Sequence, residues 1–301
     1  MAVAPVAERA PATARRSRVP QVRFSSQWLL WIAVILIMLF CLFPFYWLIN
    51  TSLKTGGDLS TGKIYPPHPT LKNYSAIFRN SDFTQALRNS AIISLTTTLI
   101  ALAVGSFAAY ALARLRFPMK FLLLAVILSI TTFPPIAIAA PVFKLWTSFS
   151  FFGYHLYNTY LGLILPDLTF TLPLTIYILT SFFREIPREL EEAALVDGAT
   201  YFQSFRKVVM PLAAPGLVTA GLLAFIFVWN EFLFAITLTS TPSRRPVPAA
   251  IAFFTGAHGQ FETPLGTISA ASVVVTVPLI ALVLIFQKRI VAGLTAGAVK
   301  G

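Results

Sequence analysis

Long stretches without a charged residue constrain this chain more than any other feature. Charges are absent from residues 24–53, 89–113, 121–143, 208–230 and 263–287. About 20 residues of helix span the roughly 30 Å hydrocarbon core of a bilayer, so each stretch is long enough to cross a membrane. Only 11% of the 301 residues are charged and 56% are hydrophobic, which is far from the composition of a water-soluble domain. The sequence therefore predicts an all-α integral membrane protein.

Six transmembrane helices are expected, because residues 157–182 form a further apolar segment. Asp167 interrupts this segment, and Pro166 and Pro173 are expected to kink it. Six spans place both ends of the chain on the same side of the membrane. The predicted spans are residues 28–49, 90–113, 121–142, 157–182, 212–239 and 264–287, within a transmembrane domain over residues 25–290.

Basic residues are divided unequally between the two sides of this topology. The two tails and the second and fourth connections carry 15 of the 23 Lys and Arg residues, and the other side carries 8. Because basic loops remain in the cytoplasm, both termini and the connection 183–211 are predicted to be cytoplasmic. Residues 1–24 hold five arginines and no apolar periodicity, which predicts a disordered basic tail. Residues 291–301 form the expected C-terminal tail.

Residue types and spacings disfavour several classes of function. The net charge of +12 lies between the hydrophobic stretches, so it indicates membrane orientation and not nucleic-acid binding. Cys41 is the single cysteine, and His68, His155 and His258 are far apart, so no disulfide and no metal site is expected. No G-x-S-x-G elbow is present for a serine nucleophile. We expect no enzyme activity and no bound cofactor on this chain.

Residues 57–64 nearly match a phosphate-binding loop, but their context argues against nucleotide binding. The motif ends in Ile64, where the pattern requires Ser or Thr for magnesium. A predicted span precedes the motif in place of a strand, prolines follow it, and the charge count places it outside the cell. Further along the same connection, residues 71–88 form an amphipathic piece that is expected to lie on the membrane surface.

One face of the second predicted span carries small residues at intervals of four, namely Ala101, Gly105, Ala109 and Ala113. Small residues in this arrangement allow another helix to approach closely. Packing within the chain and a subunit interface both fit the pattern, and packing within the chain is favoured.

The predicted cytoplasmic connection 183–211 concentrates nine of the chain's charges in 29 residues. Residues 188–196 include strong helix formers, and Gly198 permits the positive φ that ends a helix. A second helical piece is expected over about residues 200–209, ended by Pro211. Two short helices with a glycine between them should therefore lie at the cytoplasmic membrane surface.

The first of these helices presents a face of apolar, mostly small side chains. Leu190, Ala193 and Ala194 share this face. Glu191 and Glu192 project elsewhere. A helix with small side chains on one face can seat in a groove of another protein, where flanking acids pair with basic residues. A helix lying on the lipid headgroups is the alternative, but acidic residues fit poorly against anionic lipid.

The spacing in this connection follows a longer pattern. In order it reads Glu192-Ala193-Ala194, three residues, Gly198, nine residues, Val208, one residue, and Met210-Pro211. This resembles the EAA loop of binding-protein-dependent ABC importer permeases, whose pattern is E-A-A-x3-G-x9-I-x-L-P. Val208 and Met210 depart from the pattern but keep its apolar character.

Apart from the N-terminal tail, almost the whole chain resembles the maltose-type branch of carbohydrate importers. The segments that carry this likeness are Ala109–Arg114, Trp229–Phe232 and Gly293–Gly301. Phe205–Ala220 and Phe286–Gly301 are especially similar to permeases of actinobacterial trehalose importers. The resemblance implies the six-helix fold of a type I ABC importer permease, in a bacterial cell membrane.

The resemblance also implies a heteromeric importer embedded in membrane lipid. Its expected partners are a second permease, two copies of a cytoplasmic ATPase that binds ATP and magnesium, and an extracytoplasmic sugar-binding protein. The expected substrate is a disaccharide such as trehalose or maltose. Closure of the ATPases would move the loop as a rigid body and rearrange the pore. The residues expected to couple to the ATPase are Glu191, Glu192, Ala193, Ala194, Asp197, Gly198, Phe205 and Pro211.

A sugar crossing the membrane needs hydroxyl-bonding and aromatic groups, and few residues in the spans qualify. Asn230 and Glu231 are candidates, because an intramembrane ionisable group indicates function by default. Glu231 would lie about 28 Å along its helix, near the outer face, where a gate or a contact with the partner permease fits equally well. Asp167 is a further candidate. Phe225 and Trp229 share a helical face that suits stacking on a sugar, although packing is the commoner role.

Two other classes of protein are alternatives. A secondary transporter or channel complete in one chain needs a coupling-ion or selectivity site within its spans, often on broken helices. The few intramembrane charges disfavour that class. A membrane-anchored scaffold without a transport role is the third hypothesis, and co-purification of an ATPase would separate the importer subunit from both.

Overall fold

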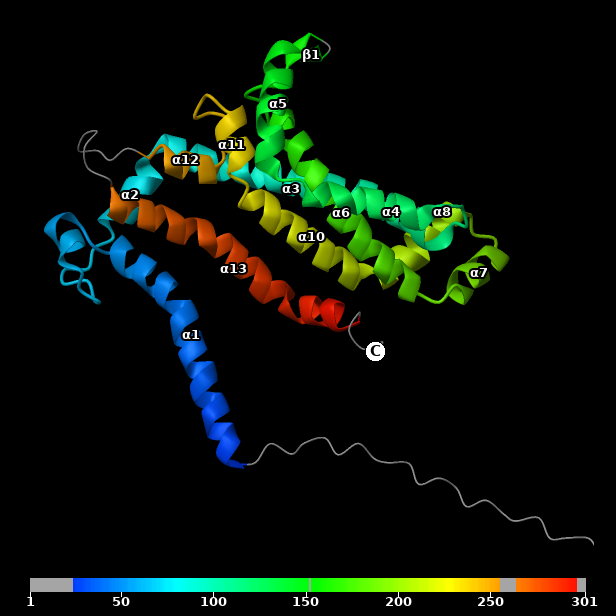
Figure 1. Cartoon of the computed structure of the whole chain (residues 1–301), viewed down its shortest axis with the longest axis horizontal. Helices are drawn as coiled ribbons and strands as arrows, with labels where there is room; N and C mark the ends of the chain where they lie inside the picture. The colour runs from blue at the N-terminus through cyan, green and yellow to red at the C-terminus, as the bar shows by residue number, and fades with distance from the viewer. Residues whose placement is uncertain (1–23, 152, 255–263, 297–301) are drawn as a thin grey trace, which may run out of the picture. The chain divides into compact units, whose positions relative to one another are not determined.

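The computed structural model describes residues 24–151, 153–254 and 264–296 (Figure 1). The chain divides into two compact units, residues 1–47 and residues 48–301. The first unit contributes most of α1 (Phe24–Ser52), a 29-residue helix that covers the first predicted span. The predicted basic tail falls almost entirely outside the described residues.

Long apolar helices dominate the second unit. α3 (Ser81–Arg114), α6 (Tyr160–Glu185) and α13 (Leu265–Ala296) are continuous and, like α1, long and apolar enough to cross a membrane. Two bent pairs of helices pass the same test, so the described residues hold four spans, or six if each bent pair is one span. The helical prediction is confirmed, apart from a short ribbon in which β1 (Ser150–Phe151) pairs antiparallel with β2 (Tyr154–His155).

The third predicted span, residues 121–142, is bent. α4 (Lys120–Ser129) continues through the 3-10 turn η2 (Ile130–Thr132), and α5 (Pro135–Ser148) then turns away by 87°. Pro134 and Pro135 explain this break, because proline donates no backbone hydrogen bond and disfavours helix in the residue before it.

The fifth predicted span, residues 212–239, is divided between two helices. α10 (Ala214–Trp229) is followed by a break at residues 230–232 and then by α11 (Leu233–Leu238). Glu231 therefore lies in the break and not about 28 Å along a straight helix.

α6 runs uninterrupted through Pro166 and Pro173, the two residues expected to kink it. Proline cannot donate to the carbonyl four residues earlier, which for Pro166 is that of Gly162. The indole nitrogen of Trp146 donates to this carbonyl instead, at 2.9 Å. A side chain of α5 thus replaces the missing hydrogen bond and ties α5 to the start of α6.

α3, α6 and α10 form the packed centre of this unit, and the small residues of α3 face into it. Ala101 and Ala109 are completely buried, and Gly105 and Ala113 are buried as well. A Cβ atom placed on Gly105 would lie only 2.8 Å from Cγ2 of Thr175 in α6. The prediction that this face packs within the chain is therefore confirmed.

The expected surface piece over residues 71–88 belongs to two different helices. α2 (Lys72–Arg79) buries Ile77 and packs against α13. The Asn80 side chain then accepts hydrogen bonds from two backbone amides and caps a new helix, α3. The prediction of a single amphipathic segment over residues 71–88 is therefore wrong, because the Asn80 cap starts a new helix at residue 81.

The two ends of the second unit carry different short elements. α7 (Glu189–Val196) lies at one end, whereas α2 and α12 (Val247–Ala252) lie at the other (Figure 1). α13 extends beyond the sixth predicted span and includes residues 291–296 of the expected tail. The end that holds α7 contains the EAA-like loop.

Candidate functional site

The predicted coupling loop, residues 183–211, contains two short helices separated by a glycine. α7 begins one residue later than the sequence predicts. Gly198 has a φ of 86°, a left-handed conformation that glycine adopts without strain. The Ala199 amide donates to the Ala194 carbonyl at 2.9 Å, which closes α7 as in a Schellman motif. The predicted first helix and its glycine stop are confirmed.

The second helix consists of three consecutive helical segments. It starts with α8 (Tyr201–Ser204), continues as the π-helix η3 (Phe205–Val209) and ends with α9 (Met210–Leu212). Thr200 and Gln203 form a capping box at its start, with reciprocal hydrogen bonds of 3.2 and 2.8 Å. This cap fixes the direction in which the helix leaves the glycine turn.

Pro211 does not end this helix, contrary to the prediction. The Met210 amide donates to the Phe205 carbonyl five residues earlier, as in a π-helix. This wider turn accommodates the proline ring, so the helix continues to Leu212. The chain then bends by 76° into α10.

A buried charge cluster joins α7 to the end of α3. Arg114 and Glu191 form an ion pair, and their side chains are 8% and 11% exposed. The Tyr110 hydroxyl donates to Glu191 Oε2 at 2.9 Å, and the Arg114 guanidinium donates to the Ile186 carbonyl at 2.9 Å. We call residues Tyr110, Arg114 and Glu191 the tie cluster. Glu191 therefore does not offer its charge to a partner protein, which corrects the expectation for the acids of this helix.

Phe205 anchors the second helix beside the tie cluster. Its side chain is 6% exposed, and its ring centroid lies 4.9 Å from that of Tyr110 and 6.3 Å from that of Phe183. Aromatic pairs at these separations stabilise packed interiors. Phe205 thus acts inside the chain, and both helices of the loop are held at the same place on α3.

The other predicted coupling residues lie at or near the surface. Ala194 is half-buried, and Pro211 is exposed. Sequence reasoning missed several exposed apolar side chains here, including Val196, which is 87% exposed. The sequence did contain a signal for this exposed apolar surface, because Val196 precedes Gly198 and Tyr201 follows it within an otherwise charged loop. We define the coupling surface by its exposed members Leu190, Glu192, Ala193, Val196, Asp197, Gly198, Tyr201 and Phe202.

Trp229 and Asn230 end α10 in different surroundings. Trp229 is 4% exposed, donates its indole hydrogen to the Val275 carbonyl at 3.2 Å and stacks on Phe225 with centroids 5.4 Å apart. The packing alternative therefore fits this pair of aromatic rings. Asn230 is exposed, and its side-chain amide donates to the Ile226 carbonyl at 2.8 Å.

Glu231 and Asp167 meet at the break after α10. The two oxygens of Glu231 accept hydrogen bonds from the Phe234 and Ala235 amides at 2.8 and 2.9 Å, so this side chain caps α11. Asp167, on α6, is 2% exposed. Both carboxyl groups line one small cavity that α3 also borders. Asp167 and Glu231 were predicted as two separate candidate sites, and in the structure they line the same cavity.

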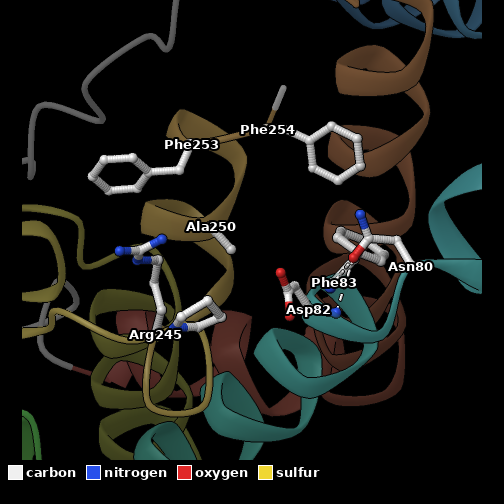
Figure 2. A pocket seen from close by; sticks show the side chains of 8 residues that line it. Asn80, Asp82, Phe83, Arg245, Ala250, Phe253 and Phe254 are labelled. Carbon is white, nitrogen blue, oxygen red and sulfur yellow. Dashed lines mark hydrogen bonds between the residues drawn. The ribbon is translucent and has the colours of Figure 1, made fainter. Parts of the chain in front are cut away.

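A second pocket lies beside α12, at the opposite end of this unit from α7 (Figure 1), and Figure 2 shows its lining side chains. Asp82 and Phe83 line it from the start of α3. The Arg245 guanidinium lies 3.9 Å from the centroid of the Phe253 ring, which also lines the pocket. Its lining thus combines charged and amide side chains with aromatic rings. Sequence reasoning missed this pocket, because its two halves are far apart along the chain.

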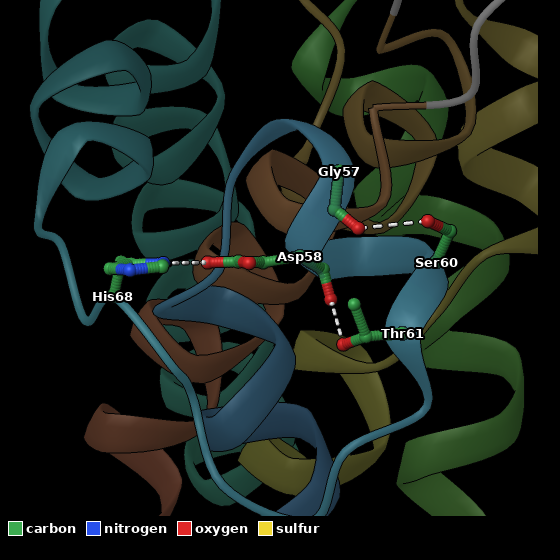
Figure 3. Close-up of polar contacts among 5 residues, drawn as sticks. All are labelled: Gly57, Asp58, Ser60, Thr61 and His68. Atoms are coloured by element: carbon green, nitrogen blue, oxygen red, sulfur yellow. Dashed lines mark hydrogen bonds and ion pairs between the residues drawn. The ribbon is translucent and has the colours of Figure 1, made fainter.

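The segment that resembles a phosphate-binding loop forms the 3-10 helix η1 (Gly56–Thr61) (Figure 3). Its two hydroxyls donate to backbone carbonyls within the turn, Ser60 to Gly57 at 2.8 Å and Thr61 to Asp58 at 2.7 Å. Asp58 also pairs with His68 at 3.2 Å. This geometry differs from the strand, loop and helix of a phosphate-binding motif.

Over the described ranges, no three His, Cys, Asp or Glu side chains gather to hold a metal ion, and His258 lies outside those ranges.

The chain belongs to the family of binding-protein-dependent transport system inner membrane components, whose model matches residues 101–295. It is therefore the membrane component of an ABC transport system and not an enzyme. The resemblance drawn from the EAA-like spacing is confirmed.

Individual relatives sharpen this assignment. The trehalose transport system permease protein SugB of Mycobacterium tuberculosis is 52% identical over 266 residues, covering 88% of this chain and 95% of the relative. The trehalose/maltose transport system permease protein MalG of Thermococcus litoralis is 39% identical over 275 residues, covering 91% and 96%. The likeness thus extends over whole subunits.

Solved structures confirm the expected fold. A bacterial ABC transporter involved in alginate import matches with a TM-score of 0.74 at 22% identity, covering 89% of this chain and 99% of that chain. The MetNI methionine ABC transporter matches with a TM-score of 0.55 at 16% identity, covering 74% and 99%. The chain has the fold of an ABC importer permease.

Proposed function

We propose that this chain is one permease of a heteromeric, ATP-driven importer that carries a disaccharide, trehalose or maltose, into the cytoplasm. Two relatives that match nearly the full chain are named for trehalose transport, which supports the sugar class. The expected partners are a second permease, two cytoplasmic ATPase subunits that bind ATP and magnesium, and an extracytoplasmic sugar-binding protein.

The tie cluster is the observation that carries this proposal. It joins α7 to α3, a 34-residue helix that runs from the coupling loop to the opposite end of the unit. A partner that displaces α7 would therefore displace α3 as well, because the buried ion pair does not slide freely. Rigid-body motion of this kind is how closure of one protein is transmitted to another.

The coupling surface supplies the contact with the ATPase. No other part of the described chain buries its exposed apolar side chains, and exposed apolar patches commonly mark protein–protein contacts. Glu192 and Asp197 add acidic groups for pairing with basic residues of the ATPase. Glu191 and Phe205 act from inside, by holding this surface on the transmembrane helices.

The charge distribution supports a cytoplasmic location for this end. Both termini and the coupling loop lie on the side with 15 of the 23 basic residues. The pocket of Figure 2 lies beside α12 at the other end, and it then faces the sugar-binding protein. The limits of the transmembrane domain, residues 25–290, remain a proposal, and α13 continues beyond residue 290 into the proposed tail.

Among the pathway candidates, Asn230 is the residue we assign to sugar contact. It is exposed at the end of α10 and carries an amide that bonds hydroxyl groups. Trp229 is buried by packing, and Glu231 bonds two backbone amides and lines the small cavity that Asp167 also lines. Glu231 is thus a positioning residue for the break, and Asp167 lies behind it.

Reconstitution tests the proposal. The purified complex in lipid vesicles should take up radiolabelled trehalose or maltose only with its binding protein outside and ATP with the ATPase. Gly198→Asp and Ala194→Asp should abolish ATPase docking or coupling, whereas Arg116→Glu, an exposed change in another connection on the same side, should not. Uptake by this chain alone without ATP would contradict the proposal and identify a secondary transporter or channel.

A further inference from the structure

The cavity behind the α10–α11 break gathers oxygen atoms from three elements. Ser90 and Ser94 line it from α3, Asp167 lines it from α6, and Glu231 lines it from the break. The other lining groups are mainly apolar side chains. The space has room for about one particle the size of a water molecule.

Asp167 has no counter-charge within the described part of the chain. Its side chain is 2% exposed, and Oδ1 accepts no hydrogen bond. The ion pairs among the described residues are Asp58 with His68 and Arg114 with Glu191, so neither carboxylate of the cavity has a basic partner there. Glu231 lies close enough to add electrostatic repulsion. A buried carboxyl group without a partner either takes up a proton or pairs with a cation, and the oxygen-lined cavity beside Asp167 has room for a cation.

Ser94 gives an independent indication. Its hydroxyl is buried, the residue being 1% exposed, and it has no hydrogen-bond partner although it lines the same cavity. Ser90 accepts a hydrogen bond from the Val247 amide at 2.8 Å and keeps a second lone pair. Two hydroxyl oxygens therefore accompany the carboxylates, and oxygen is the ligand that hard cations prefer.

The charge balance indicates a monovalent ion. The two backbone amides that bond Glu231 offset much of its charge, so about one negative charge remains at Asp167. Mg²⁺ and Ca²⁺ take six or more oxygen ligands and usually keep several waters, and a cavity with room for about one water-sized particle leaves no space for those waters. Discontinuous helices are also where transporters coordinate sodium, through groups freed at the break.

We infer that Asp167, Glu231 and Ser94, with Ser90, bind a sodium-sized monovalent cation that joins α3, α6 and the α10–α11 break. The ion supplies the positive charge that Asp167 lacks and a partner for the Ser94 hydroxyl. It is a fixed component of the site, and its binding does not depend on sugar or ATP.

Equilibrium binding of radioactive Na⁺ tests this site directly. The full chain is purified with its co-purifying subunits in lipid nanodiscs, in choline chloride without sugar or nucleotide. We expect one saturable site for each copy of this chain. Asp167→Asn should weaken binding by about tenfold or more, because even the loss of a group that only supports a metal ligand costs about tenfold. Ser94→Ala should weaken it by about threefold, as loss of a neutral contact does.

Glu185→Gln is the matched control, because Glu185 is an exposed carboxylate at the far end of the same helix as Asp167. Its sodium affinity should equal that of the wild type. The absence of a saturable sodium site in the wild-type complex would overturn the inference, whatever the variants do. Unchanged affinity in both Asp167→Asn and Ser94→Ala would also overturn it. The sodium measurement uses no transport assay. A complex without a sodium site would therefore leave the importer proposal intact, and a complex that fails to import sugar would leave the sodium inference intact.

Discussion

Glu191 in the coupling loop and Asp167 in α6 are both buried acidic residues, but their surroundings differ. Glu191 has an arginine and a tyrosine of its own chain as partners. Asp167 has an unbonded oxygen and a second carboxyl group nearby. The Glu191 carboxylate is thus paired with a positive charge of its own chain, whereas the Asp167 carboxyl group has no such partner among the described residues.

This difference separates two uses of buried charge. A charge that is paired within the chain fixes geometry, and the tie cluster does this between α7 and α3. A charge that is left unpaired by the chain needs a partner from outside it, here the inferred cation. α3 connects the two places, because it carries Tyr110 and Arg114 near one end and Ser90 and Ser94 near the other.

The largest expected effect comes from breaking the tie cluster. Glu191→Ala leaves Arg114 buried without its counter-charge, which should lower the free energy of unfolding by about 3–5 kcal/mol. Denaturant titration of the purified protein measures this loss. Glu189→Ala, an exposed acid on the same helix, is the control and should change stability by less than about 0.5 kcal/mol. Equal stability of the two variants would show that the tie cluster does not hold α7.

The next effect concerns the close approach of α3 and α6. Gly105→Ala places a methyl group against Thr175 and should cost about 1–3 kcal/mol of stability by overpacking. Thr175→Ser removes the methyl group that it would meet, so the double variant should recover most of the loss. A double variant as unstable as Gly105→Ala would mean that the two helices do not meet at this point.

A smaller effect is expected at the break. Glu231→Gln weakens the cap on the Phe234 and Ala235 amides and should cost about 0.5–2 kcal/mol, in line with other helix caps. Hydrogen exchange should become faster in α11 but remain unchanged in α7. Faster exchange in α7 as well would contradict the separation of the two regions.

The smallest effect on stability is expected at the coupling surface. Val196→Ser changes a side chain that is 87% exposed and should alter the free energy of unfolding by less than about 0.5 kcal/mol. It should still reduce the amount of ATPase that co-purifies, because the valine is apolar surface for docking. Full co-purification would remove Val196 from the coupling surface.

Local sequence signals predicted the coupling loop well. Gly198 marked the end of α7, and the spacing to Pro211 marked the family, because both depend on residues close together in the chain. The tie cluster was missed, since Tyr110 and Glu191 are 81 residues apart and only tertiary packing brings them together.

Helix direction was the weaker part of the prediction. Hydropathy reports how apolar a segment is and not where it bends, so the breaks at Pro134-Pro135 and at residues 230–232 were read as continuous spans. The proline pair and the polar pair Asn230-Glu231 were the available signals. The meeting of Asp167 with Glu231 depends on the second of these breaks, so the sequence did not reveal their common cavity.

Cross-linking from the coupling surface tests the central claim most directly. Cys41 is the single natural cysteine, so Val196→Cys in a Cys41→Ser background gives one reactive position. We predict that the thiol introduced by Val196→Cys cross-links to a nucleotide-hydrolysing subunit in the native membrane, and that a membrane-impermeant thiol reagent added outside intact cells does not label it. Labelling from outside, or no cross-link to any ATPase, would contradict the account.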